Sequence, residues 1–309
     1  MRAVRFHEYG DETVLRVEGV ADPRPGEGEV VVRVVTAGTN PGEASIRSGA
    51  MKEMFPVEFP EGQGSDLAGI VAAVGPGVSH VQVGEAVIGF SDGRNAHAEL
   101  ALLPADRVVP KPEALDWAVA GTLFVAGTTA LAMLQTVPVQ QGDVVVIAGA
   151  AGGVGVFLTQ LAVGTGARVI AIAGESNHDW LRAHGAEPVQ YGDDVEQRLR
   201  DAAPEGVTAF FDCFGRGYTD LAVALGVPLD RIDTIIDFGA VERLGVQAKG
   251  MAALDDPAAG VAQLAAIASQ GGFEVPIKAR FPLEAVQEAY RELSGRSGLG
   301  KIVLEVSAP

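Results

Sequence analysis

The chain has 309 residues, enough for two domains that each bury a core, and 48% of them are hydrophobic, which indicates a globular protein. Its formal net charge of −17 argues against a surface for nucleic acid or for anionic membrane, because both surfaces need clustered Lys and Arg. A single cysteine, Cys213, excludes an internal disulfide and a multi-thiolate zinc site, and is expected to be a small core residue.

The first third of the chain is predicted to be rich in β-strands. Short runs of Val and Ile alternate there with Gly, Pro and Asp turns, and four such runs are EVVVRVVTAG (29–38), SDLAGIVAAVG (65–75), EAVIGF (85–90) and HAELALL (97–103). This spacing is typical of a small barrel or sandwich. The segment PKPEALDW (110–117) then marks a change of pattern.

The longest apolar run, from Ala118 to Leu134, has 17 residues and is rich in Gly, Ala and Thr. A run of this length and composition predicts a buried helical segment rather than a membrane span. The N-terminal MRAVRFHEYG also lacks the apolar core of a signal peptide. We therefore expect a soluble cytoplasmic protein.

From about residue 123 onward, predicted strands alternate with predicted helices. The strand runs are VVVIAG (144–149), RVIAIAG (168–174), EPVQYG (187–192), TAFFDCFG (208–215) and DTIIDFGA (233–240). Alternation of this kind predicts an α/β fold with a doubly wound parallel sheet, whose ligands bind at the carboxyl ends of the strands. The tail is predicted to hold a helix near 256–270, a helix from Phe281 and a last strand in KIVLEV.

The segment AAGGVG (150–155) joins the first of these strands to a predicted helix at 153–163. Ala150, Gly152 and Gly155 occupy the three small positions of a G-x-G-x-x-G pattern. Such a loop lets the backbone approach a pyrophosphate at a helix N-terminus. Taken alone, the motif is equally consistent with a tight turn between a strand and a helix.

Several motifs in fixed order resemble the zinc-independent quinone oxidoreductase branch of the medium-chain dehydrogenase/reductase superfamily. Besides GAAGGVG, they are GTNPGEASIRSG (38–49), GSDLAGIVAAVGPGVSHVQVGEAVIGF (64–90), GTTAL (127–131), HGAE (184–187) and GKIVLEV (300–306). The resemblance covers nearly the whole chain and identifies GAAGGVG as a pyrophosphate cradle. It implies transfer of a hydride from NADPH to a quinone or an activated C=C bond.

The resemblance also implies the domain organisation. A GroES-like β-barrel domain would span 1–122 and be completed by 256–309, and a Rossmann nucleotide-binding domain would span 123–255. The active site would lie in the cleft between them.

Three residues are candidates for the catalytic site by this resemblance. Asn40 would hold the nicotinamide carboxamide or a ribose hydroxyl, although an Asn before Pro41 also caps its own turn. Thr128 would lie beside the nicotinamide, or bond the carbonyl one helical turn back. Lys301 would reach the cleft, or stay solvated on an edge strand. Asp66 is expected only to bond nearby backbone N–H groups.

Further candidates would bind the cofactor. Backbone N–H groups of Gly152, Gly153 and Val154 would meet the pyrophosphate. Phe238 and Gly239, ending a predicted strand, would lie against the nicotinamide ribose, and the alternative for Phe238 is a core aromatic.

A preference for NADPH is expected from the end of the second strand of the nucleotide-binding domain. Gly174 stands where NAD-selective Rossmann domains keep an acidic residue for the ribose 2′-hydroxyl. Ser176, where relatives usually have Arg, and the neighbouring Asn177 and His178 would bind the 2′-phosphate, or the first two would cap a helix. Tyr191 would lie near the adenosine phosphate, or pack at a strand end. The anionic Glu175 opposes the preference.

Two further expectations follow from the resemblance. The scattered histidines and the lone cysteine predict that no metal takes part. A homodimer is expected, with sheets joined through a strand at GVQAKGM (245–251).

Two alternative functions stay open at this stage. One is an enoyl-thioester reductase of lipid or polyketide synthesis, disfavoured because no Tyr lies between Tyr9 and Tyr191, where those relatives place a proton donor. The other is a cofactor-binding protein without turnover.

Overall fold

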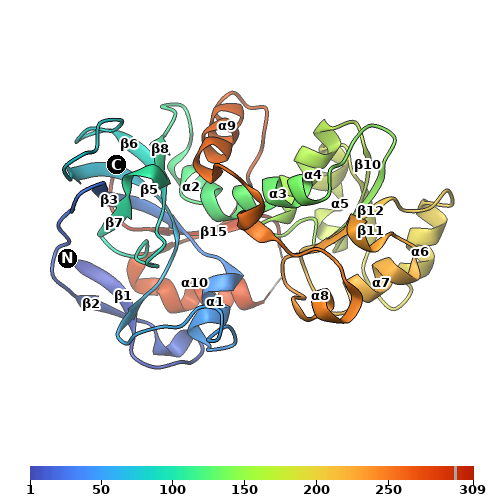
Figure 1. Ribbon diagram of the computed structural model, residues 1–309, viewed down its shortest axis with the longest axis horizontal. Coiled ribbons are helices and arrows are strands. Elements are labelled where there is room, and N and C mark those ends of the chain that lie inside the picture. The colour runs from blue at the N-terminus through green and yellow to red at the C-terminus, as the bar shows by residue number, and fades with distance from the viewer. Residues whose placement is uncertain (296–297) are drawn as a thin grey trace. The chain divides into compact units, whose positions relative to one another are not determined.

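The computed structural model describes residues 1–295 and 298–309, and these fall into two compact units. The first unit comprises Met1–Val125, Asp256–Arg296 and Lys301–Pro309, and the second comprises Ala126–Asp255 and Ser297–Gly300. Each unit has its own sheet and its own core (Figure 1). The mixed α/β architecture, with a mainly β unit and a unit built on a parallel sheet, agrees with the predicted fold class.

The first unit is built mainly of β-strands. A large sheet runs in the order β14 (Ile277–Pro282), β15 (Lys301–Glu305), β3 (Glu29–Gly38), β5 (Asp66–Val74), β6 (Ala86–Phe90) and β8 (Val108–Pro110), with β7 (Leu100–Pro104) also paired to β3. A smaller sheet has the order β2 (Arg16–Gly19), β1 (Arg2–Phe6) and β4 (Glu61–Gly62). The Val-rich β3 is buried along most of its length, as its run of β-branched residues predicts.

The first unit also contains α-helices. They are α1 (Pro41–Arg47), α2 (Trp117–Ala120), α9 (Pro257–Ser269) and α10 (Val286–Ser294). Helix α10 packs against β14 and β15 and also contacts α1 (Figure 1). The predicted helix from Phe281 therefore begins later than expected, because Phe281 and Pro282 pair with β15 as the end of β14.

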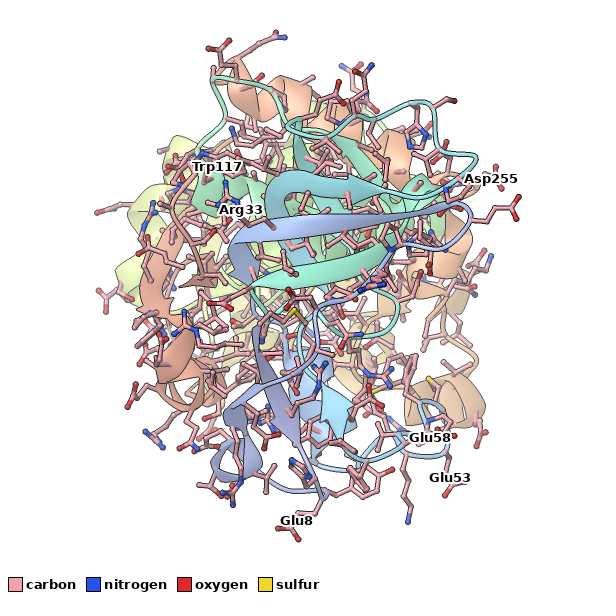
Figure 2. All side chains as sticks on the ribbon, turned by 90° about the vertical axis from the view of Figure 1, so that its left-hand side faces the viewer. Glu8, Arg33, Glu53, Glu58, Trp117 and Asp255 are labelled. Atoms are coloured by element: carbon pink, nitrogen blue, oxygen red, sulfur yellow. The ribbon has the colours of Figure 1, made fainter. Side chains whose placement is uncertain are left out.

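The loop after α1 lies on the surface of the first unit. Residues 52 to 56 are exposed, and the side chains of Glu53 and Glu58 project into solvent (Figure 2). They contribute to the acidic surface that the net charge predicts.

The second unit is a five-stranded parallel sheet. Its order is β11 (Glu187–Gln190), β10 (Arg168–Ala173), β9 (Val144–Ala148), β12 (Ala209–Asp212) and β13 (Ile232–Thr234). All five residues of the central β9 are buried, which confirms that its apolar run forms a strand covered on both faces. The helices of this unit are α4 (Gly155–Gly164), α5 (His178–Ala183), α6 (Val195–Ala202), α7 (Tyr218–Ala224) and α8 (Gly239–Leu244), and most of α3 (Leu123–Thr136) also belongs to it.

Two predictions for the last strand of this sheet are wrong. The run DTIIDFGA leaves the strand after Thr234, because the Thr234 hydroxyl accepts from the backbone N–H groups of Ile236 and Asp237 and so forms a turn. The segment 245–251 is not a strand either. Only Gln247 bridges to Asp233, and left-handed Gly245 and Gly250 bend the chain on both sides.

The apolar run from Ala118 to Leu134 forms α2 and most of α3, which confirms the helical prediction. Among the residues that the structure describes, no helix reaches the length and hydropathy needed to cross a bilayer.

Candidate functional site

The G-rich loop of the second unit follows β9 at the carboxyl edge of the sheet. Gly149 adopts a left-handed conformation, with φ of 75°, that turns the chain into α4. A Cβ at Gly155 would lie 2.1 Å from the carbonyl oxygen of Gly149 and 2.6 Å from the carbonyl carbon of Ala150. The first turn of α4 therefore packs against the loop at a distance that only glycine permits.

The loop leaves backbone donors free at the start of α4. Within the described part of the chain, the N–H groups of Gly153 and Val154 meet no acceptor, and both residues are partly exposed. The N–H of Gly152 instead donates to Gly149 O at 2.9 Å, so the prediction that it serves the pyrophosphate is wrong. Ala150 likewise donates to Ile172 O. Two adjacent free donors at a helix N-terminus form an anion site.

The carboxyl end of β10 presents the predicted adenosine-side residues. Gly174 follows the strand directly, and a Cβ there would meet the ring of Tyr191 at 3.4 Å. Tyr191 is 58% exposed and Ser176 is also exposed, so both side chains are accessible. Ser176 lies inside a short 3₁₀ turn, Glu175–Asn177, and caps no helix, so the capping alternative is wrong for it.

Asn177 and His178 are less available than the sequence predicts. Asn177 is buried, and its Nδ2 donates to Gly298 O at 3.4 Å, while no capping bond to α5 forms. The Nε2 atom of His178 donates to Ala173 O at 3.3 Å. Both side chains hold the turn after β10 together, which makes them supports for the loop rather than free donors.

Phe238 and Gly239 begin α8 instead of ending a strand. Phe238 is 42% exposed, so the alternative of a core aromatic is wrong. Thr128 is fully buried in α3.

In the first unit, Asn40 lies between β3 and α1 at the centre of a buried polar cluster. Its Oδ1 accepts from Lys301 Nζ at 2.6 Å, and its Nδ2 donates to Glu43 Oε1 at 3.1 Å and to Asp66 Oδ2 at 3.0 Å. An ammonium on one side and two carboxylates on the other fix which way the amide points. Both amide hydrogens are used, so one lone pair of Oδ1 is the capacity that remains.

Lys301 is the buried cation of this cluster. Only 3% of the residue is exposed, so the alternative of a solvated edge-strand lysine is wrong. Its Nζ also donates to Thr39 O at 3.2 Å and lies 3.9 Å from Asp66 Oδ2. Burial lowers the pKa of Lys301, and the nearby carboxylates oppose that shift.

Asp66 is fully buried at the start of β5. Its Oδ1 accepts from the backbone N–H of Val125 at 2.6 Å, as expected, and its Oδ2 faces Asn40 and Lys301. Burial raises the pKa of Asp66 to about 6, against the opposing effects of Lys301 and the two hydrogen bonds. The carboxylate thus depends on its partners to stay ionised near neutral pH.

The sequence analysis missed two members of this cluster. Glu43 accepts from the Asn40 backbone N–H at 3.0 Å, and its spacing, three residues after an Asn that begins a helix, is the signal that would have found it. Tyr290 on α10 donates a hydrogen bond to Glu43 across 247 residues of sequence, and no local sequence pattern predicts that contact.

Within the described ranges, 1–295 and 298–309, no group of three or more His, Cys, Asp and Glu side chains lies in a position to hold a metal ion.

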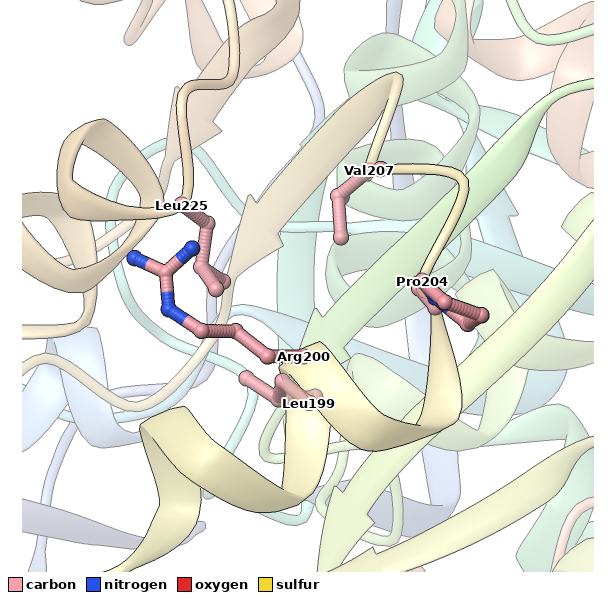
Figure 3. A pocket seen from close by; sticks show the side chains of 7 residues that line it. Leu199, Arg200, Pro204, Val207 and Leu225 are labelled. Atoms are coloured by element: carbon pink, nitrogen blue, oxygen red, sulfur yellow. The ribbon is translucent and has the colours of Figure 1, made fainter.

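A hollow of about 150 Å³ also occurs in the second unit (Figure 3). Its lining comes from the end of α6, the loop before β12 and Leu225 at the end of α7, so it opens at the amino edge of the sheet. The guanidinium of Arg200 beside it is already bonded to Glu196 and to Ala224 O. The hollow is therefore separate from the loop edge described above.

Family models and a curated relative match this chain. Residues 26–113 match the alcohol dehydrogenase GroES-like domain, and residues 184–304 match the family model described as zinc-binding dehydrogenase. A quinone oxidoreductase from Sus scrofa is 30% identical over 98% of this chain and 97% of its own length.

Solved structures agree with these matches. The quinone oxidoreductase from Coxiella burnetii superposes with a TM-score of 0.88 at 28% identity and covers 99% of both chains. A mycobacterial protein solved in complex with NADPH gives a TM-score of 0.84, also at 28% identity, over 99% of this chain and 100% of the other.

Proposed function

Since the chain belongs to the quinone oxidoreductase branch of the medium-chain dehydrogenase/reductase superfamily, we propose that it reduces a quinone or an α,β-unsaturated carbonyl compound with NADPH. The observation that carries this proposal is the loop after β9. It offers two N–H groups at the start of α4, from Gly153 and Val154, that meet no acceptor among the described residues, and its packing tolerates only glycine at position 155. When bound, NADPH would supply the hydride, which is the difficult part of the chemistry.

The chain's own residues would bind and orient the reactants. Gly153 and Val154 would hold the pyrophosphate through their N–H groups. Asn40 would accept a hydrogen bond through the remaining lone pair of Oδ1, from the nicotinamide carboxamide or a ribose hydroxyl. Thr128, Phe238 and the backbone of Gly239 would complete the nicotinamide side. Such positioning would raise the rate of hydride transfer, because it brings the donor and acceptor carbons into contact. Water would protonate the product.

A panel of acceptors tests the proposal. Oxidation of NADPH would be followed with 1,4-benzoquinone, 9,10-phenanthrenequinone, a simple enone and a crotonyl thioester. We expect turnover with the quinones or the enone and little with the thioester. Turnover with the thioester alone would identify an enoyl-thioester reductase, and binding of NADPH without any turnover would identify a cofactor-binding protein.

We further propose that NADPH is preferred over NADH. Gly174 places no carboxylate at the end of β10, and exposed Ser176 and Tyr191 flank that position. Ser176→Arg should raise the ratio of kcat/KM for NADPH over NADH about tenfold, because a hydrogen bond to a charged group contributes about 1.5–3 kcal/mol and a neutral one about 0.5–1.5. Ser176→Gln, long but neutral, serves as the control. An unchanged ratio in the arginine variant would place the 2′-phosphate elsewhere.

We propose that turnover needs no metal, because hydride transfer to a quinone requires that the two reactants are positioned and that a proton is supplied. The buried Asp66 carboxylate already has partners in Lys301, Asn40 and the Val125 N–H. EDTA should leave kcat unchanged, and metal analysis should give far less than one zinc per chain. Loss of activity on chelation that zinc restores would reverse this conclusion.

The protein is also proposed to form a homodimer through the sheet of the second unit. Strand β13 ends that sheet with three residues, and a bridge to Gln247 covers its outer edge at one point. An open edge invites aggregation, and pairing across a two-fold axis removes it. Light scattering should give about twice the chain mass of 31.9 kDa. A monomer at micromolar concentration would exclude the arrangement.

A further inference from the structure

Tyr290 is a buried side chain of the Asn40 cluster for which the proposed chemistry has no use. It lies on α10, is 2% exposed, and packs its ring under the guanidinium of Arg47 at 4.6 Å. Its hydroxyl accepts from Gln63 Nε2 at 2.7 Å and donates to Glu43 Oε2. A core position of this size is usually filled by Phe or Leu, which bury no polar group. The buried hydroxyl of Tyr290 therefore indicates a role beyond packing.

The partner of that hydroxyl, Glu43, receives four hydrogen bonds. Oε1 accepts from Asn40 Nδ2 at 3.1 Å and from Ser65 N at 2.8 Å. Oε2 accepts from Asn40 N at 3.0 Å and from the Tyr290 hydroxyl. Four donors and no acceptor are the surroundings that an ionised carboxylate needs. A protonated Glu43 would bring a fifth hydrogen into this shell and break at least one of the four contacts.

Two of these four contacts belong to Asn40, so the state of Glu43 decides the state of the Asn40 amide. While Glu43 accepts, Nδ2 stays turned toward Glu43 and Asp66, and Oδ1 stays turned toward Lys301. If Glu43 no longer accepted, the amide would lose one of the two contacts that hold Nδ2, and its position would depend on Asp66 and Lys301 alone.

We propose that Tyr290 is a positioning residue for the reaction: by donating to Glu43, it keeps that carboxylate an acceptor and holds the Asn40 oxygen ready to accept from the cofactor. The inference rests on the proposed function, because it assumes that Asn40 meets NADPH. Tyr290 itself would touch neither cofactor nor substrate.

Within the described residues, charged and titratable groups approach Glu43 from several elements. Facing it are Arg47 on α1, Tyr290 on α10, His97 before β7, Asp66 on β5 and Lys301 on β15. Burial and the Glu43 charge raise the pKa of Tyr290 well above its usual range, so the hydroxyl keeps its proton. Removing the hydroxyl therefore takes one of its four donors from Glu43 and leaves the charges of the cluster unchanged.

Tyr290→Phe tests the proposal, because it removes the hydroxyl and keeps the ring. The dissociation constant for NADPH, measured by fluorescence titration at pH 8, should rise about tenfold, because one hydrogen bond to a charged group is lost. The KM for NADPH should rise with it, while kcat at saturating NADPH should change much less. Tyr9→Phe is the matched control, since Tyr9 is a partly exposed tyrosine of the same unit whose hydroxyl makes no hydrogen bond within the described residues.

Glu43→Gln provides a second, independent variant. It places an amide donor where the carboxylate stood, so affinity should be low at every pH, and adding Tyr290→Phe should cause no further loss. If the losses of NADPH affinity caused by the two single substitutions multiplied in the double variant, the proposal would be overturned. A Tyr290→Phe protein that is less stable to heat but keeps the wild-type dissociation constant for NADPH would also overturn it.

A failure of the proposed function would be recognised separately. It would appear in the wild-type protein, as absence of NADPH binding. A failure of the present inference would appear as equal dissociation constants for NADPH in wild type and Tyr290→Phe.

Discussion

Replacing Gly155 with valine should weaken NADPH binding about a hundredfold. The new side chain would begin 2.1 Å from Gly149 O and 2.6 Å from the carbonyl carbon of Ala150, so α4 must move away from the loop. Both obstacles are backbone atoms, which cannot rotate out of the way. Displacement of about 1 Å in a positioning element costs on the order of a hundredfold. The free N–H groups of Gly153 and Val154 would then no longer converge on the pyrophosphate.

Gly164 gives the matched control for this prediction. It ends the same helix, and a Cβ there would meet nothing within 4 Å. Gly164→Ala should leave the dissociation constant for NADPH unchanged. Isothermal titration would measure both variants, with circular dichroism to check that each is folded. Binding of wild-type strength in folded Gly155→Val would mean that the loop is only a turn.

The second large effect is expected from Lys301→Met, on stability. The variant removes the buried cation beside Asp66 and leaves the acid 0% exposed with its charge uncompensated. Loss of one member of a buried pair destabilises a protein by about 3–5 kcal/mol. We expect a decrease of that size in the free energy of unfolding at pH 8, measured by urea denaturation.

The pH dependence of this variant distinguishes the ion pair from simple packing. The pKa of Asp66 in the folded protein, about 6, is already above the unfolded value of about 3.9. Because the pKa of Asp66 is higher in the folded than in the unfolded protein, the free energy of unfolding decreases as the pH rises from the unfolded to the folded pKa. Removing Lys301 raises the folded pKa of Asp66 further. The stability difference from wild type should therefore be larger at pH 8 than at pH 5.

Lys111 supplies a control of the same residue type. It is also buried in the first unit, but its Nζ donates to Pro112 O and has no carboxylate within 4 Å in the described part of the chain. Lys111→Met should be destabilising to a similar extent at pH 5 and pH 8. A pH-independent loss in Lys301→Met as well would contradict the role given to Asp66.

The elements that follow local pattern were predictable from the sequence. The β-branched run of β9 and the small residues after it gave the strand, the turn and the helix of the cofactor loop, because each depends on neighbours in the chain. Even there, the sequence did not distinguish free donors from bonded ones. Gly152 uses its N–H within the turn, while Gly153 and Val154 do not.

The parts that were wrong or missed depend on distant partners. The last strand stops at Thr234, whose hydroxyl also donates to Asp212 Oδ2 on the neighbouring strand, 22 residues earlier. The cluster around Asn40 joins α1, β5, β15 and α10, and its members are separated by up to about 260 residues. The family resemblance identified Asn40 and Lys301 as candidates, but which atoms of each stay available is a property of the folded chain.

The central proposal is that the protein oxidises NADPH by hydride transfer to a quinone or an α,β-unsaturated carbonyl compound. The most direct test is the anaerobic stoichiometry with purified wild-type protein and 1,4-benzoquinone, with Gly155→Val as the impaired control. We predict one hydroquinone formed per NADPH consumed over many turnovers, and a rate at limiting NADPH about a hundredfold lower in the variant. No enzyme-dependent consumption of NADPH, or equal rates in the two proteins, would contradict the account.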